Sequence, residues 1–363
     1  MKVEQVAALG QAIWLDYIDR SLLVTGGLKS LVEDGIRGVT SNPTIFERAI
    51  AGSADYREQL AEAALAGDTA EEIYERLVLD DIRAALDILY PVYEETEGLD
   101  GYVSLEVDPL LASDTEGTVA EARRLFSEIS RPNLLIKVPA TPAGIPAIEQ
   151  LISEGVNVNA TLIFSQAHYE ATAKAYIRGL ERRMGRGEDV TSIASVASLF
   201  ISRMDTAVDG MLAEREEGDL QGKIGIANTK MIYQRFLELF CGERWEALAA
   251  AGARVQRPLW ASTSTKNPAY PDTMYVERLI ARHTVNTMPP GTLEAFRDHG
   301  MVATTIYSGL GKAKEHLARL GALGIDINAV ANDLQDEGVE KFIDSFRSLL
   351  ETIEGERKRA LGS

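Results

Sequence analysis

Residues 133–144 read NLLIKVPATPAG, and one charged side chain stands inside this apolar stretch. The aliphatic residues on either side of it are typical of a strand that is buried on both faces. An unpaired ammonium in such a place costs several kcal/mol, or it gives up its proton. We therefore expect a chemical role for Lys137, and the alternative is a side chain that reaches solvent at the end of the strand.

The rest of the chain alternates short apolar runs with helical patterns, as parallel βα units do. The predicted strands lie near residues 12–18, 38–42, 102–107, 133–139, 156–164, 192–200, 257–263 and 283–289. Helical patterns between them include residues 118–129, 141–155, 165–185 and 229–240. Such units predict an α/β fold of the closed (β/α)8 type, a TIM barrel, and the alternative is an open doubly wound sheet.

Two connections are long enough to carry helices of their own. They span residues 43–100 and 203–256, and neither has the Pro/Gly/Ser-rich composition of an interdomain linker. After residue 290 the chain continues in helical patterns. We therefore predict a single domain, residues 1–363, with helical insertions and a helical C-terminal tail over residues 307–363.

The composition narrows the class of partner and substrate. The 363 residues carry a formal net charge of -18, which argues against nucleic acid and anionic membranes as partners. No apolar run is long enough to predict a transmembrane helix, and no secretory signal pattern is found. The single cysteine, Cys241, fits a cytoplasmic location. An anionic substrate would need a local basic site, because the overall charge repels it.

Polar side chains stand near the end of almost every predicted strand. In a (β/α)8 barrel these ends form the active site, so the side chains should converge. They are Asp16, Asn42, Glu106, Lys137, Asn159, Thr161, Ser198, Arg203, Ser262, Ser264 and Lys266. Taken singly, an Asp or Asn in such a place is often a turn or cap residue, and a serine is uninformative.

Read together, these groups suit covalent catalysis by an amine. Desolvation favours the neutral form of a buried lysine, whose amine can attack a carbonyl and form a Schiff base. The iminium is an electron sink, so a neighbouring C–C bond can break as in an aldol reaction. A carboxylate on the first strand and another on the third suit the two proton transfers that this chemistry needs.

Metal and nucleotide chemistry have less support. Neither an HxH nor an HExxH pair is formed by the histidines, which are His168, His283, His299 and His316. A Mg2+ ion bound by carboxylates is an alternative that the sequence leaves open. The chain contains no GxxxxGK[ST] motif and no GxGxxG after a strand. We therefore predict no metal and no cofactor.

Five segments resemble transaldolase in the longer form of that family: TSNPTIF, LEVDP, NLLIKVPAT, GVNVNATLIFS and NTMPPGTLEAF. The resemblance runs from about residue 14 to residue 296. It implies a Schiff-base enzyme of the non-oxidative pentose phosphate pathway, on a (β/α)8 barrel without metal or cofactor. Such an enzyme moves a dihydroxyacetone unit from sedoheptulose 7-phosphate or fructose 6-phosphate to glyceraldehyde 3-phosphate or erythrose 4-phosphate.

The resemblance also implies roles for individual residues. Lys137 corresponds to the Schiff-base lysine, and Asp16 to the aspartate that acts on the C4 hydroxyl. Glu106 corresponds to the glutamate that works through a catalytic water, which Thr161 holds. The substrate-binding residues that it implies are Asn42 and Asn159 for the dihydroxyacetone part, Arg203 for phosphate, and Ser198 five residues before that arginine.

The sequence departs from the family pattern after the seventh strand. The best-known members carry a serine and an arginine two residues apart there, whereas WASTSTKN offers Ser262 and, as its nearest cation, Lys266. We count both residues, together with Phe200, among the predicted substrate-binding residues. Fructose-6-phosphate aldolase-like enzymes are a close rival, but they are shorter and carry glutamine in place of Glu106 and tyrosine in place of Phe200. A non-catalytic sugar-phosphate-binding barrel is the second rival.

No motif of the family covers the region after Ile306. The tail is therefore either a long helix that folds back on the barrel or a connection to a partner domain. For the assembly, the two predictions are a homodimer and a fusion to another sugar-phosphate enzyme domain.

Overall fold

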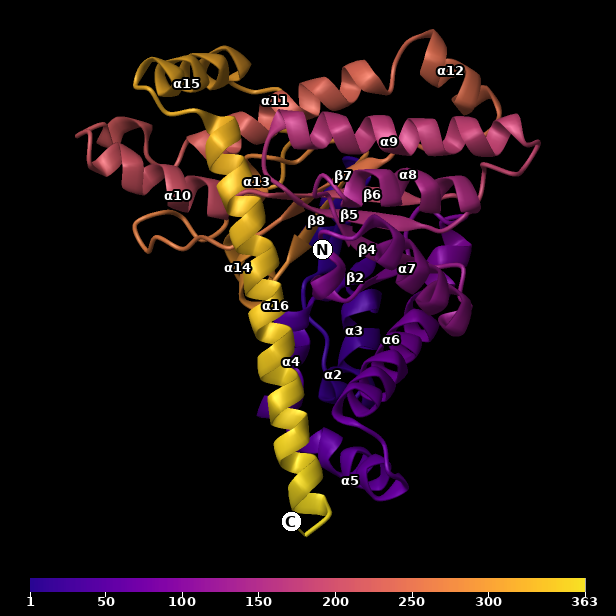
Figure 1. Ribbon diagram of the computed structural model, residues 1–363. Helices are drawn as coiled ribbons and strands as arrows, with labels where there is room; N and C mark the ends of the chain where they lie inside the picture. Colours follow the sequence, from indigo (N-terminus) through magenta and orange to yellow (C-terminus); the bar gives the residue numbers. More distant parts are fainter. Residues whose placement is uncertain (363) are drawn as a thin grey trace.

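Eight short strands pair in chain order, all parallel, and close when β1 pairs with β8 (Figure 1). The computed structural model describes residues 1–362. The strands are β1 (Gln11–Leu15), β2 (Gly38–Thr40), β3 (Tyr102–Glu106), β4 (Leu134–Pro139), β5 (Val158–Ile163), β6 (Ser195–Phe200), β7 (Arg257–Ala261) and β8 (Thr284–Met288). The predicted closed (β/α)8 barrel is confirmed, and the open doubly wound sheet is excluded.

Several strands end earlier than predicted, so Asp16, Asn42 and Ser262 lie in loops just beyond them. Helices cover the outside of the barrel: α1 (Lys2–Ala8), α2 (Arg20–Val24), α3 (Gly27–Glu33), α7 (Thr115–Ile129), α8 (Gly144–Glu154), α9 (Gln166–Gly185), α13 (Met274–Glu277) and α14 (Pro290–His299). Side-chain caps mark the starts of α2, α7 and α9; before α9, Ser165 accepts a hydrogen bond from the backbone N–H of His168.

Both long connections carry helices, as predicted. The first contains α4 (Pro43–Gly52), the short helix η1 (Ala54–Tyr56), α5 (Arg57–Ala66) and α6 (Ala70–Glu95). The second contains α10 (Ser202–Ala213), η3 (Gly218–Leu220), α11 (Ile224–Leu239) and α12 (Glu243–Ala250). A further short helix, η2 (Pro109–Leu111), follows β3. None of the helices within residues 1–362 is both long and apolar enough to cross a membrane.

Large side chains fill the N-terminal half of the barrel interior. Trp14 packs there with Tyr102, Leu135 and other inward residues of the strands. Gly38 faces the indole, and a Cβ at this position would lie 2.6 Å from Trp14 Cδ2, so only glycine fits. Because apolar packing closes this end, the open space lies at the other end, where the strands finish.

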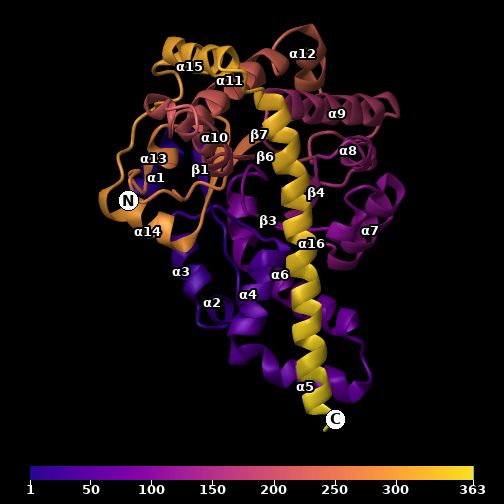
Figure 2. The ribbon, with the colours of Figure 1, turned by 60° about the vertical axis from the view of Figure 1, so that its left-hand side comes forward.

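The C-terminal region folds back on the barrel through α15 (Leu310–Ala322) and the 34-residue α16 (Ile327–Ala360). Helix α16 runs from the neighbourhood of α10 past α4 to α5 (Figures 1 and 2). The Thr44 and Ser345 hydroxyls are 2.8 Å apart and join α4 to α16, and Leu349 and Ile353 are fully buried in the main core. The first alternative for the tail, a helix that folds back, is what the structure shows.

Helix α16 is also fixed to the catalytic ends of two strands. Gln335 Nε2 donates to the carbonyl oxygens of Ala140 (3.1 Å) and Leu162 (2.8 Å). Leu162 has a positive φ of 59° at an irregular point of β5. Its side chain reaches α16 at Gly338, where a Cβ would lie 2.8 Å from Leu162 Cδ2. The distortion of β5 at Leu162 therefore directs this side chain against α16, where the absence of a Cβ at Gly338 makes room for it.

Candidate active site

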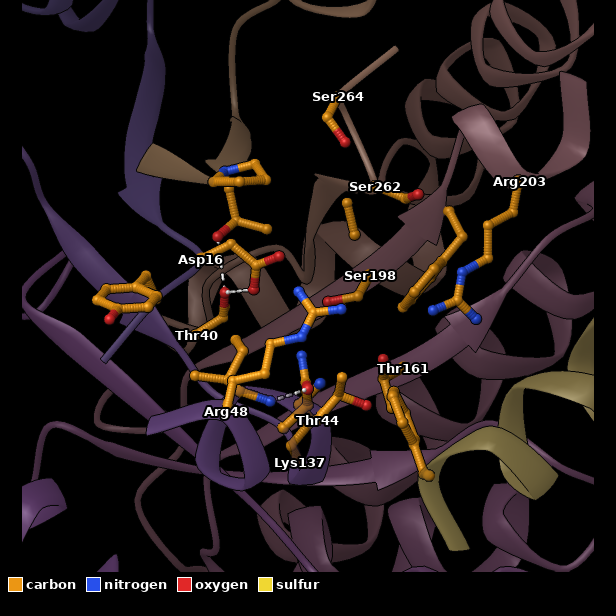
Figure 3. Close-up of a pocket in the computed structure, with 18 of the residues that line it drawn as sticks. Asp16, Thr40, Thr44, Arg48, Lys137, Thr161, Ser198, Arg203, Ser262 and Ser264 are labelled. Atoms are coloured by element: carbon orange, nitrogen blue, oxygen red, sulfur yellow. Dashed lines mark hydrogen bonds between the residues drawn. The ribbon is translucent and has the colours of Figure 1, made fainter. Parts of the chain in front are cut away.

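A cavity of about 470 Å³ opens at the C-terminal ends of the strands (Figure 3). Nine of the predicted site residues line it: Asp16, Asn42, Lys137, Thr161, Ser198, Phe200, Arg203, Ser262 and Lys266. Ser264 lines it as well. Two predicted residues, Glu106 and Asn159, lie behind this lining. The convergence expected from the barrel ends is therefore present.

The buried lysine is paired. Lys137 Nζ donates to Glu106 Oε2 at 3.0 Å and to the Ser41 carbonyl oxygen at 3.1 Å. Only 5% of the Lys137 side chain and 3% of the Glu106 side chain are exposed. The ring centroid of Phe342 on α16 lies 5.4 Å from the same nitrogen. The alternative of a side chain that reaches solvent is therefore excluded. The neighbouring strand β3 supplies the carboxylate that pairs with the ammonium.

Glu106 has one oxygen that remains available. Its Oε1 atom is buried and, within residues 1–362, has no hydrogen-bond partner, and the same holds for the hydroxyl of Thr161. Burial raises the pKa of the Glu106 carboxyl, while the charge and hydrogen bond of Lys137 act in the opposite direction. A carboxyl of this kind can accept or donate a proton, and the two unpartnered oxygens can each take part in a further hydrogen bond.

Asp16 lies directly after β1 and is fixed by a chain of hydroxyls. The Thr40 hydroxyl donates to Asp16 Oδ1 at 2.7 Å, and the Thr287 hydroxyl lies 2.7 Å from that of Thr40. Burial raises the pKa of the Asp16 carboxyl, and the hydrogen bond from Thr40 followed by the charge of Lys137 partly offset this. A raised pKa brings a carboxylate closer to the range in which it works as a general base.

The two asparagines differ in their surroundings. Asn42 is the N-cap of α4: its Oδ1 accepts from the Ile45 backbone N–H at 3.0 Å. Asn42 also lines the cavity, so it is both a helix cap and a residue of the candidate site. Asn159 is fully buried, since its Nδ2 donates to Ser104 Oγ (2.9 Å) and its Oδ1 accepts from Ser198 Oγ (2.7 Å).

Three cations surround the outer part of the cavity: Arg203, Lys266 and Arg48. The guanidinium of Arg203 lies 5.0 Å from the ring centroid of Phe200. Burial lowers the pKa of Arg203, and the carboxylates of Asp16 and Glu106 act against this change. Burial and the charges of Arg203 and Arg48 lower the pKa of Lys266. The carboxylate of Asp16 acts against this change at Lys266 as well, but the repulsion among the three cations favours an anionic ligand near them.

Hydroxyls accompany these cations. Ser262 has a positive φ of 54°. Its Oγ lies 2.8 Å from the Oγ of Ser202, the residue that precedes Arg203 in the chain. Lys266 Nζ donates to Ser264 Oγ at 2.8 Å. The loop after β7 therefore brings its serines, Ser262 and Ser264, to the cavity that Arg203 also lines (Figure 3), and Lys266 of the same loop lines it as well.

Comparison with known proteins agrees with this geometry. The model of the family described as Transaldolase/Fructose-6-phosphate aldolase matches residues 13–353. A transaldolase of Trichodesmium erythraeum is 48% identical over 98% of this chain and 97% of its own length. Transaldolases of Parafrankia sp. and Thiobacillus denitrificans are each 50% identical, over 97% and 96% of this chain and 96% and 99% of their own lengths.

The chain belongs to the transaldolase family. The resemblance seen in the sequence motifs is thereby confirmed, and it extends beyond residue 296 into α16. The relatives named above carry the transaldolase name, so the chain is a transferase of that family and not a non-catalytic barrel.

Sequence reasoning missed several residues of this transaldolase-family cavity. Thr44 and Arg48 are four positions apart on α4 and both line it, so the helical spacing after Asn42 was a usable signal. Thr40 and Thr287 stand at inward-facing positions near the strand ends. For Phe342 no signal existed, because only the packing of α16 brings it to the cavity.

Proposed function

We propose that Lys137, Glu106 and Asp16 carry the transaldolase reaction of this chain through a Schiff base. The observation that carries the proposal is the buried Lys137–Glu106 pair, whose amine nitrogen lines a cavity with a second carboxylate on one side and cations on another. These are the groups that amine-based aldol chemistry needs.

In the first step the Lys137 ammonium loses a proton to Glu106, which lies 3.0 Å away. The free amine attacks the C2 carbonyl of the ketose and forms a carbinolamine. Protonated Glu106 then returns a proton to the departing C2 hydroxyl, through a water that Thr161 holds. The C–O bond breaks, water leaves, and the nitrogen shares its electron pair to give the iminium.

In the second step Asp16 removes the proton of the C4 hydroxyl. The C3–C4 bond breaks, its electrons enter the iminium to give an enamine, and an aldose phosphate leaves. An acceptor aldose then takes up the three-carbon unit by the reverse sequence, and hydrolysis of the iminium frees the amine. The Thr40 hydroxyl supports this role, because it holds Asp16 in one orientation.

Sugar phosphates are the substrates of this family, and their phosphate needs a local basic region in a chain of net charge -18. We assign that region to Arg203, Lys266 and the serines of the loop after β7. Asn42 would hold the dihydroxyacetone part directly. Asn159 would act through Ser198, since both ends of its amide are already hydrogen-bonded.

The organisation of the chain is part of the proposal. We propose one domain over residues 1–363, in which the tail over residues 307–363 is an integral wall, supported by the burial of Leu349 and Ile353 in the main core. A cytoplasmic location and an assembly, either a homodimer or a fusion to another sugar-phosphate enzyme domain, remain predictions.

Borohydride reduction in the presence of fructose 6-phosphate tests the chemistry. It should inactivate the protein and add a reduced three-carbon unit to the peptide that contains Lys137. Lys230 is the internal control, because it is another buried lysine but donates to the Thr305 and Ser308 carbonyl oxygens away from the cavity. A label on Lys230, or no label, would contradict the proposal. Lys137→Arg should be inactive, since guanidinium keeps its proton.

A further inference from the structure

A second cavity of about 360 Å³ lies beside the first, between α6, α7, η2 and α16. Lys137 lines the first cavity and Glu106 lines the second, although the two side chains form one ion pair. On α16, Phe342 lines the first cavity and Phe346, one turn later, lines the second. The partition between the cavities therefore consists of the catalytic pair, with one turn of α16 beside it.

The second cavity connects Glu106 with the surface. Its outer residues are exposed, including Glu71, Leu110 and Arg124, and its inner residues, Leu105 and Glu106, are buried. Tyr74 lies in its wall with the ring in edge contact with Phe346, 5.2 Å between centroids. Asp108 lines the same cavity, and burial, followed by the carboxylates of Asp108 and Glu106, raises the pKa of Tyr74.

The proposed chemistry creates a need for such a connection. Loss of the C2 hydroxyl from the carbinolamine releases one water beside Glu106, and hydrolysis of the iminium later consumes one. During the first event the complete sugar is still covalently attached and occupies the first cavity. The unpartnered Oε1 of Glu106 and hydroxyl of Thr161, both buried, are polar atoms that a water at this place would contact.

We propose that the second cavity is the passage through which water moves between Glu106 and solvent while the sugar occupies the first cavity. The inference rests on the proposed Schiff-base function. Its ligand is water, carried past the hydroxyl of Tyr74 and the carboxylate of Asp108. Passage of water through this cavity changes how fast the C2 oxygen is exchanged with solvent and leaves the equilibrium amount of iminium unchanged.

An isotope experiment tests the passage. Fructose 6-phosphate that carries a heavy oxygen isotope at C2 is incubated with the Asp16→Asn variant, which should form the Schiff base without cleaving the sugar. Loss of the label to water is measured after correction for exchange without enzyme, and borohydride trapping measures the iminium. Leu350→Trp and Leu111→Trp narrow the second cavity from α16 and from η2. Leu237→Trp is the matched control, a half-buried leucine of α11 that lines neither cavity.

We expect both narrowing substitutions to slow the loss of label severalfold while the trapped fraction stays at that of the control. Label loss equal to that of Leu237→Trp in both variants would overturn the passage. Using two variants from different walls keeps the test decisive if one of them fails to fold. Absence of trapping in the Asp16→Asn parent would instead contradict the proposed function, so the two failures are distinguishable.

Discussion

Lys137 and Glu106 occupy partner positions in the register of β4 and β3, and Lys137 Nζ lies 3.0 Å from Glu106 Oε2. The alignment of the two strands therefore sets the position of both side chains, and little conformational freedom has to be lost to form the pair. Because both are buried, removing one partner leaves an uncompensated charge, which typically costs about 3–5 kcal/mol. The register of the two strands therefore places the ammonium and the carboxylate in contact.

Replacement of the carboxylate tests its part in proton transfer. Glu106→Gln keeps the shape but cannot accept the ammonium proton, so Schiff-base formation should slow by roughly 10²–10⁴-fold, the usual contribution of an acid–base group. Stopped-time borohydride trapping measures this rate. Glu116→Gln, at an exposed position of α7, is the control and should behave as the unchanged protein. Trapping at an unchanged rate in Glu106→Gln would remove Glu106 from this step.

Asp16 is expected to act after the Schiff base has formed. Asp16→Asn retains an acceptor for the Thr40 hydroxyl but cannot take the C4 proton. Borohydride should then trap the complete ketose on Lys137, and release of the aldose should fall by about 10²–10⁴-fold. Mass measurement of the reduced peptide separates a whole sugar from a three-carbon unit. If Asp16→Asn and Glu106→Gln stop at the same step, the division of roles is wrong.

The pH dependence of cleavage follows from the raised pKa of Asp16. A general base must be ionised, so the cleavage rate should fall as pH drops through this pKa. The acid limb should therefore lie above the range of an ordinary aspartate, about 3.9. The charge of Lys266 lowers the pKa of Asp16, so Lys266→Ala should move the limb to still higher pH. The measurement is the single-turnover rate of cleavage as a function of pH, and Lys312→Ala, at an exposed position, is the control. If the acid limb of Lys266→Ala coincides with that of the control, the assignment of Asp16 as the general base is wrong.

The cations at the cavity should matter only for phosphorylated substrates. A charge-assisted hydrogen bond contributes about 1.5–3 kcal/mol, so Arg203→Ala should lower kcat/KM for fructose 6-phosphate by about one to two powers of ten. Arg48→Ala and Lys266→Ala should show a smaller loss, because both side chains are more exposed. Unphosphorylated fructose is the control substrate. Equal losses on both substrates would indicate that Arg203 serves the fold or the chemistry.

Phe342 is expected to stabilise positive charge at Lys137. Its ring centroid is 5.4 Å from Nζ, and a cation–π contact corresponds to about 2- to 30-fold in an equilibrium at 1.36 kcal/mol per tenfold. The nitrogen is positive in both the resting ammonium and the iminium but neutral in the attacking amine, so Phe342→Leu should leave the trapped iminium fraction at equilibrium unchanged and speed iminium formation by up to that factor. Phe346→Leu is the matched control one turn away, since it faces the other cavity and packs on Tyr74. Equal rates of iminium formation in the two variants would show that the ring of Phe342 only fills space.

The sequence was sufficient for the barrel because each strand carries its own local signal. Short apolar runs such as that around Lys137 alternate with helical spacing, and this periodicity needs no knowledge of distant contacts. Site residues late in the strands, such as Asp16 and Thr161, follow from the same pattern because all parallel strands end at one face.

The features of the site that the sequence did not predict depend on contacts between segments that are far apart in the chain. The Lys137–Glu106 pair requires the register of two strands, and Phe342 reaches the cavity only through the packing of α16. Arg48 is different, because its spacing of four positions from Thr44 on the helix after Asn42 was a local signal that could have been used. Asn159 was placed correctly in its strand, but its lateral hydrogen bonds to Ser104 and Ser198 could not be read from one strand alone.

Translation makes every strand before it makes α16. When the ribosome has delivered the chain as far as Ile306, all the strands and the catalytic pair exist, but Phe342 and Gln335 do not. A chain that ended there would hold all the strands, but it would lack the residues of α16 that line one side of the first cavity and part of the second. Catalytic competence is thus expected to arrive late in synthesis, so that incomplete chains released early would be folded in outline and enzymatically silent.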